Sequence, residues 1–262
     1  NNNFRWDSNF TLSHNKNKIK ELVRDYVHPE TGELINKDRL DVGGLGKARF
    51  ILKEGGTLGD LYTQSDLKRD DNGMVDIDPT GIVAIENNLP DIKLGSVFPK
   101  ANLAWSNHFS WKGISLSALF TARIGGIVYS ATEAAMDQYG VSERSALARD
   151  NGGVLVNNRT LVDAQNYYTT IGSESGLPQY YTYNATNVRL QEASIGYLIP
   201  RKWLGNVCDI QVSVIGRNLW MIYNKAPFDP ESVATTDNYY QGIDYFMLPS
   251  TRNIGFNVKI NF

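Results

Sequence analysis

Residues 253 to 262 alternate without a break between apolar and polar side chains, and this pattern constrains the fold more than any other feature of the chain. The apolar members are Ile254, Phe256, Val258, Ile260 and Phe262, and the polar or small members are Asn253, Gly255, Asn257, Lys259 and Asn261. Successive side chains of a β-strand point to opposite faces of its sheet. The segment therefore predicts a strand with one apolar face and one polar face.

Alternation of the same kind predicts eight strands in all. The clearest pair covers residues 101–111 and 114–123, which are separated by the two-residue turn Lys112-Gly113 and therefore predict a β-hairpin. In residues 188–199 the apolar phase shifts near Glu192, which predicts a β-bulge. The remaining predicted strands cover residues 4–14, 47–53, 58–64 and 210–220.

Composition excludes several classes of protein. No run of about 18 apolar residues occurs, which excludes a helical membrane protein, whereas alternating strands of about ten residues are what a membrane β-barrel needs. With 26 basic and 28 acidic residues the net charge is −2, so nucleic acid is not an expected partner. The single cysteine, Cys208, has no partner for an internal disulfide.

The connections between the predicted strands alternate in length. Short ones cover residues 53–57, 112–113 and 201–206, and long ones cover 15–44, 65–98, 125–185 and 221–250. An outer-membrane barrel has short periplasmic turns and long external loops, whereas a soluble sandwich has no reason to gather its long loops at one end. The alternation therefore favours an antiparallel transmembrane β-barrel with apolar faces toward lipid and polar faces toward the lumen.

Aromatic residues lie beside the short connections, as at a membrane interface. These residues are Phe4, Trp111, Trp203 and Phe262, and Trp220 falls near the opposite end of its strand. The alternative is that the tryptophans fill a soluble core, but their alternation with Asn, Ser, Lys and Arg disfavours it. Within the longest loop, Ser130 and Glu133 form a capping-box pattern and Gly140 a stop signal, which predicts a short helix.

Residue patterns for catalysis or metal binding do not occur. His14, His28 and His108 are far apart, and no nucleophile elbow, phosphate-binding loop or zinc spacing is present. The acidic stretch 70–81 does not place ligands at the spacing of a calcium loop, so we expect a solvated turn there. We therefore expect no enzyme activity, no cofactor and no metal site.

Five segments resemble the C-terminal part of the SusC/RagA family of TonB-dependent outer-membrane transporters. The most specific are NATNVRLQEASIGYLIPRKWL at 184–204 and GRNLWMIYNKAPFDPE at 216–231. The others are SHNKNKI at 13–19, Gly242-Ile243-Asp244 and Pro249-Ser250-Thr251-Arg252. The chain departs from the family pattern at Ala226-Pro227-Phe228, where glycine is usual, and at Leu248, where tyrosine is common.

The resemblance implies that residues 1–262 are the last eight strands of a barrel of about 22 strands, without the plug and the earlier strands. It also implies residence in the outer membrane of a Gram-negative bacterium and import of oligosaccharides or peptides with energy from the TonB complex, which would act through the absent N-terminal region. A SusD-like surface lipoprotein would be a partner, and Phe262 would be the aromatic signal for barrel insertion. A small self-contained barrel that acts as an anchor or adhesin, and a soluble carbohydrate-binding sandwich, are the alternatives.

Recognition is expected in the long loops, because a wide barrel cannot select cargo with its strands alone. Tyrosine rings there can stack on sugars or on peptide side chains. The candidate residues for substrate or partner contact are Tyr139, Tyr167, Tyr168, Tyr180, Tyr181, Tyr239, Tyr240, Asp244 and Tyr245.

Overall fold

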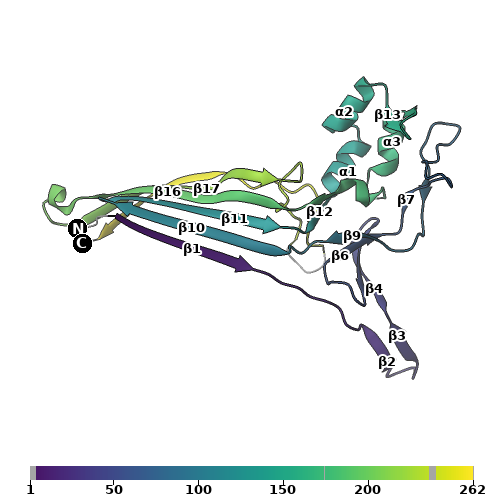
Figure 1. The fold of residues 1–262 in the computed structure, drawn as a ribbon, viewed down its shortest axis with the longest axis horizontal. Coiled ribbons are helices and arrows are strands. Elements are labelled where there is room, and N and C mark those ends of the chain that lie inside the picture. The colour runs from purple at the N-terminus through teal and green to yellow at the C-terminus, as the bar shows by residue number, and fades with distance from the viewer. Residues whose placement is uncertain (1–3, 174, 236–239, 262) are drawn as a thin grey trace.

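A computed structural model describes residues 4–173, 175–235 and 240–261. Its largest element is one antiparallel sheet of six strands in the order β1-β10-β11-β16-β17-β19. The strands run side by side from the end where β1 begins and β19 ends to a group of loops and helices at the other end (Figure 1). Their bounds are β1 Phe4–Ser13, β10 Ala101–Trp111, β11 Ile114–Ile124, β16 Asn187–Ile199, β17 Asp209–Asn224 and β19 Asn253–Asn261.

The two faces of this sheet differ as the alternation predicts. One row of neighbours across four strands is polar and consists of Asp7, His108, Ser117 and Ser194. On the opposite face most rows are aromatic or aliphatic, as for Trp6, Phe109 and Leu116, because the register aligns apolar residues of successive strands. The pair of Ser8 and Asn107 is a polar exception on this face. The predicted amphipathic strands are therefore confirmed.

The apolar face of the sheet carries aromatic stacks and has no second layer over it. Trp6 stacks on Phe109 with ring centroids 5.8 Å apart, and Trp105 stacks on Phe120 at 5.6 Å. The side chain of Trp6 is nevertheless 56% exposed and that of Phe10 62%. A soluble sandwich would bury these rings against a second sheet, so this face argues against that alternative.

Two local predictions within the sheet are confirmed. Lys112 and Gly113 both have positive φ, at 47° and 86°, which is the backbone of the tight hairpin turn between β10 and β11. The register of β11 against β16 shifts between Leu119 and Phe120, whose partners are Glu192 and Leu190, so Gln191 is an extra residue that forms a bulge in β16.

The predicted number of long strands in this sheet is wrong, because the sheet has six described strands and not eight. Residues 47–53 and 58–64 do form strands, β5 (Ala48–Lys53) and β6 (Asp60–Thr63), but these pair with β4 and β9 in a separate four-stranded sheet. At six and four residues they are shorter than the nine to eleven residues that a membrane strand needs. A single connection, 14–100, therefore replaces two predicted long loops, and short and long connections still alternate.

The three long connections contain the remaining elements. Loop 14–100 contains β2 Val23–Val27, β3 Leu34–Lys37, β4 Arg39–Leu45, β5, β6, β7 Asp66–Leu67, β8 Ile85–Glu86 and β9 Ile92–Ser96. Loop 125–186 contains β12 Ile127–Ser130, α1 Ala131–Gln138, α2 Glu143–Asp150, β13 Val154–Val156, β14 Thr160–Val162, α3 Ala164–Ile171, the 3₁₀ helix η1 Pro178–Tyr181 and β15 Thr182–Asn184. Loop 225–252 contains β18 Ile243–Asp244, and the short connection after β16 contains the 3₁₀ helix η2 Arg201–Leu204.

The long loops share one hydrophobic core at the end of the sheet. Phe50 and Leu61 come from the first loop, Tyr181 and Leu177 from the second, and Ile243 from the third. Polar contacts join them as well, since Asn157 accepts a hydrogen bond from the Val75 amide at 2.8 Å. The loops therefore form a single packed cap, which Figure 1 shows at the end opposite the short turns.

The helix predicted in loop 125–186 is confirmed as α1. Ser130 caps it by accepting a hydrogen bond from the Glu133 amide, and Gly140 follows its end with φ of 69°. No helix among the described residues has the length and apolar character needed to cross a membrane.

Candidate functional site

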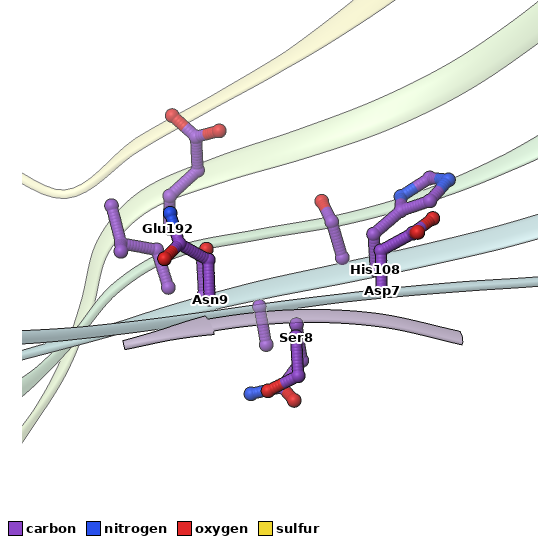
Figure 2. A pocket seen from close by; sticks show the side chains of 10 residues that line it. Asp7, Ser8, Asn9, His108 and Glu192 are labelled. Carbon is purple, nitrogen blue, oxygen red and sulfur yellow. The ribbon is translucent and has the colours of Figure 1, made fainter. Parts of the chain in front are cut away.

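The polar face of the six-stranded sheet forms a shallow groove over β1, β10 and β11. Figure 2 shows Asp7, Asn9, His108 and Glu192 projecting to one side of the strands and Ser8 to the other. The groove has a volume of about 320 Å³. Hydroxyl, amide, imidazole and carboxylate groups line it, so this face can hydrogen-bond water or a polar solute along its length.

Two ion pairs lie on the polar face. Arg5 lies 2.7 Å from Asp7 within β1, and Arg217 of β17 lies 2.8 Å from Glu192 of β16. The side chains of Arg5 and Arg217 are largely exposed, so solvent screens both pairs and each contributes little to stability. Each pair adds one positive and one negative charge, so the pairs keep the face polar and add no net charge to it.

Where β16 meets the cap, Arg189 joins the six-stranded sheet to loop 225–252. Its side chain is only 2% exposed, and its guanidinium contacts both carboxylate oxygens of Asp229. Glu231 lies 3.4 Å away, and the Arg189 Nε donates to the Asn187 side chain at 3.1 Å. A buried guanidinium bound on several sides fixes the loop that carries Asp229, because releasing it would leave a buried charge unpaired.

The carboxylate of Asp229 is the second half of this junction. Ser250 donates its hydroxyl to Asp229, and the Asn218 side chain donates to the Ser250 carbonyl at 3.0 Å, so both ends of loop 225–252 are tied together. Burial opposes the charged form, but the hydrogen bonds from Arg189 and Ser250 lower the pKa of Asp229 below its ordinary value. The aspartate is therefore ionised at neutral pH.

A second buried carboxylate, Asp137, organises the helices of the cap. Ser142 and Tyr181 donate their hydroxyls to it, the latter at 2.8 Å, and Arg144 pairs with it at 2.7 Å. Burial lowers and the Asp137 carboxylate raises the pKa of Arg144, with a net increase. Burial, followed by the charge of Asp137, raises the pKa of Tyr181. This network fixes the end of α1 against the start of α2 and against η1.

The tyrosines of loop 125–186 differ in how far they are exposed. Tyr181 is fully buried, and Tyr180 and Tyr167 pack against the same core. Burial, with smaller contributions from Tyr180 and Tyr168, raises the pKa of Tyr167 to about 12. Tyr139 is instead 76% exposed at the end of α1, and Tyr168 lines a pocket with it. Tyr181 therefore has no ring surface available to a ligand, whereas Tyr139 and Tyr168 border a pocket.

The candidates in loop 225–252 occupy different environments. Tyr240 is partly exposed and packs edge-on against Phe50 with ring centroids 6.4 Å apart. Asp244 is buried and accepts the Ser130 hydroxyl at 2.6 Å, whereas Tyr245 is partly exposed. Tyr239 and Phe262 lie outside the described residues.

Four residues with a place in these networks or in the helical part of the cap could not be identified from the sequence. Asp137 and Arg149 lie in helices whose sequences give no sign of a site, and the partnership of Arg189 with Asp229 joins segments 40 residues apart. The only available signal was that Arg189 and Asp229 both fall within the two most specific resemblance motifs. The described residues contain no group of three His, Cys, Asp or Glu side chains that could hold a metal ion.

Comparisons with known proteins agree with this architecture. No protein-family model matches the chain. The chain is 25% identical to TonB-dependent receptor P3 of Formosa agariphila, over 99% of its own length and 27% of the relative. It therefore spans about a quarter of the length of that receptor.

Solved structures with a similar fold include those of a peptide transporter. The RagAB peptide transporter matches 100% of the chain with a TM-score of 0.63 and 16% identity, and the chain covers 28% of it. The RagAB peptide importer in its open-open state matches with a TM-score of 0.60 and 17% identity, and the chain covers 27% of it. The predicted resemblance to TonB-dependent transporters and the all-β antiparallel fold class are thereby confirmed.

Proposed function

We propose that this chain is the C-terminal part of the barrel of an outer-membrane active transporter that imports oligosaccharides or peptides with energy from TonB. The observation that carries the proposal is the six-stranded amphipathic sheet with all three long connections at one end. The similarity of the whole chain to a TonB-dependent receptor and to a peptide transporter supports it. In this assignment the apolar face contacts lipid and the polar face borders the lumen.

The two edges of the sheet support a larger barrel. In the described residues β1 and β19 are the outer strands of the sheet and do not pair with each other. An open edge is not stable in hydrocarbon, because its amide and carbonyl groups would have no partners. We therefore favour pairing with further strands, to a total of about 22, over a self-contained barrel that serves as an anchor or adhesin.

The membrane orientation follows from the loop lengths. The turn at Lys112-Gly113 and the connection 200–208 would lie in the periplasm, and the cap would face outward. A packed cap at the external mouth is a suitable surface for cargo and for a SusD-like lipoprotein, since binding residues usually lie on loops held by a rigid scaffold. Tyr139, Tyr168, Tyr240 and Tyr245 are the described candidates for these contacts, and Tyr239 stays a candidate from the sequence.

The proposal is tested by uptake in cells. Disruption of the gene should abolish uptake of one class of fluorescently labelled cargo, either short peptides or oligosaccharides, and the complete gene should restore it. Collapse of the proton gradient across the inner membrane should block the same uptake while leaving binding at the cell surface intact. Uptake that continues after disruption, or that does not depend on energy, would contradict active transport by this protein.

Association with a lipoprotein is tested separately. The affinity-tagged transporter should co-purify with a surface lipoprotein in detergent, and alanine at Tyr240 and Tyr245 should weaken either this association or cargo binding about tenfold, because loss of an aromatic anchor costs 1 kcal/mol or more. A variant that assembles normally and keeps both affinities would restrict these rings to loop packing.

A further inference from the structure

A pocket opens in the cap where the three helices of loop 125–186 meet. The end of α1 contributes Gln138 and Tyr139, α2 contributes Arg149, and α3 contributes Gln165 and Tyr168. Its volume is about 290 Å³, which is near the lower limit for small-molecule sites and suits one sugar ring or one amino-acid residue. The three helices that line it lie in the cap, beyond the end of the six-stranded sheet (Figure 1).

The walls of the pocket are held in place before any ligand arrives. Asp137 at its base is fully shielded from solvent and is held by Ser142, Tyr181 and Arg144. The Arg149 Nη1 donates to the Gly140 carbonyl at 2.8 Å, which holds the guanidinium next to the end of α1. A site preorganised in this way loses less conformational entropy on binding.

The charge available to a ligand is positive. The negative charge of Asp137 is compensated by Arg144, which lies 2.7 Å away. Arg149 is exposed and forms no ion pair with any carboxylate of the described residues. Of the five N–H donors of a guanidinium, one is used by Gly140, and the planar fork suits a carboxylate bound through both oxygens.

The remaining walls add contacts without charge. The exposed Tyr139 ring and the half-buried Tyr168 ring can cover an apolar side chain or the C–H face of a sugar. Gln138 and Gln165 supply amide donors and acceptors for hydroxyl or peptide groups. A single anionic group beside an aromatic wall is therefore the chemistry that this pocket complements.

We propose that the pocket between α1, α2 and α3 is a binding site for a carboxylate-bearing unit of the transported cargo, with Arg149 as the group that recognises the carboxylate. The proposal rests on the proposed transport function and specifies its cargo. Two sources share this chemistry, a uronic acid of an oligosaccharide and the terminal carboxylate of a peptide. The neutral counterpart of either lacks the charge that pairs with Arg149.

The test measures the preference for acid over amide. Purified transporter in detergent is titrated, with ligand-observed nuclear magnetic resonance, against D-glucuronate and D-glucuronamide, and against N-acetyl-glycyl-alanine and its C-terminal amide. We expect one acid to bind at least tenfold more tightly than its amide, and the identity of that acid indicates the source. Arg149→Gln should abolish the preference, and Arg149→Lys, which keeps the charge without the fork, should retain part of it.

Arg159→Gln is the matched control. Arg159 is an exposed arginine of the same loop, and its side chain has no partner among the described residues, so this variant should keep the full preference. Circular dichroism should confirm that each variant is folded. Equal affinities for acid and amide in the wild type, no binding of either acid, or a preference that survives Arg149→Gln would overturn the site.

Failure of the site and failure of the transport function are distinguishable. Energised uptake in cells without any preference for carboxylates would remove the pocket as a cargo site and leave transport standing. A carboxylate preference that depends on Arg149 in a protein without energised uptake would support the pocket and contradict transport.

Discussion

A charge placed on the apolar face of β17 tests the lipid-facing assignment most directly. Val214 is 49% exposed on that face, and its cross-strand neighbours Ile195 and Phe256 are also apolar. Its neighbour in sequence, Ser213, lies on the polar face, where it pairs with Asn257. We predict that Val214→Arg strongly destabilises the protein in a bilayer and that Ser213→Arg does not.

The depth of Val214 sets the size of the effect. It lies five residues after Asp209, where β17 begins, and six residues before Trp220, the aromatic residue near its far end. At about 3.4 Å per residue and a tilt of about 40°, five residues correspond to about 13 Å along the membrane normal. Because the apolar band of a barrel is about 25 Å tall, Val214 lies close to its middle. Arginine there should cost about 2–4 kcal/mol, or roughly 30-fold to 700-fold in the folding equilibrium.

The assay is a guanidinium refolding titration of the complete transporter in phospholipid vesicles, followed by tryptophan fluorescence. Ser213→Arg should cost less than about 1 kcal/mol, because its charge can enter the aqueous side of the wall, and Trp220→Arg should cost an intermediate amount near the interface. Equal costs for Val214→Arg and Ser213→Arg would refute the assignment of the faces. A larger cost at Ser213 would reverse it.

Three further predictions follow from the loops. An epitope tag within loop 125–186 should be detected on intact cells and one at Lys112 only after lysis, and the reverse pattern would overturn the orientation. Hydrogen bonding lowers the pKa of Asp229, so the stability that the ionised carboxylate contributes to the fold is complete above the unfolded pKa of about 3.9 and is lost as the pH falls through the lower folded pKa. Protease cleavage of loop 225–252 should therefore rise below pH about 4. Asp229→Asn should show rapid cleavage already at neutral pH. Tyr181→Phe removes a donor to the buried Asp137 and should lower the free energy of unfolding by about 1–3 kcal/mol in thermal denaturation, whereas a loss under about 0.5 kcal/mol would make this hydrogen bond dispensable.

Local sequence patterns were sufficient to predict most strands of the six-stranded sheet. Alternation in residues 101–111 and 114–123 predicted both the strands and the turn between them, because a two-residue turn fixes the register of its hairpin. The phase shift near Glu192 located the bulge in β16, and the spacing of Ser130 and Glu133 located a helix start. In each case the signal and the structure lie within a few residues of each other.

The alternation pattern did not predict which sheet a strand joins when that depends on its pairing partners. The polar and apolar residues of 47–53 resemble those of a strand in the six-stranded sheet. In the structure, however, β5 pairs with β4 and β6 and is buried in the cap. Periodicity reports which faces a strand has, but not which sheet it joins, because that depends on contacts between residues far apart in the chain.

The candidate site was the part that the sequence determined least. It directed attention to tyrosine-rich loops, and Tyr139 and Tyr168 do line a pocket, but it could not separate them from Tyr181, which has the same side chain and is fully buried. Arg149 suits its proposed role in binding a carboxylate only because the Gly140 carbonyl holds its guanidinium in place and because Arg144 compensates the charge of Asp137. The sequence by itself determined two-faced strands and long connections; only the tertiary structure decided which charges are paired and which remain accessible, because pairing depends on distances between segments that the chain brings together by folding.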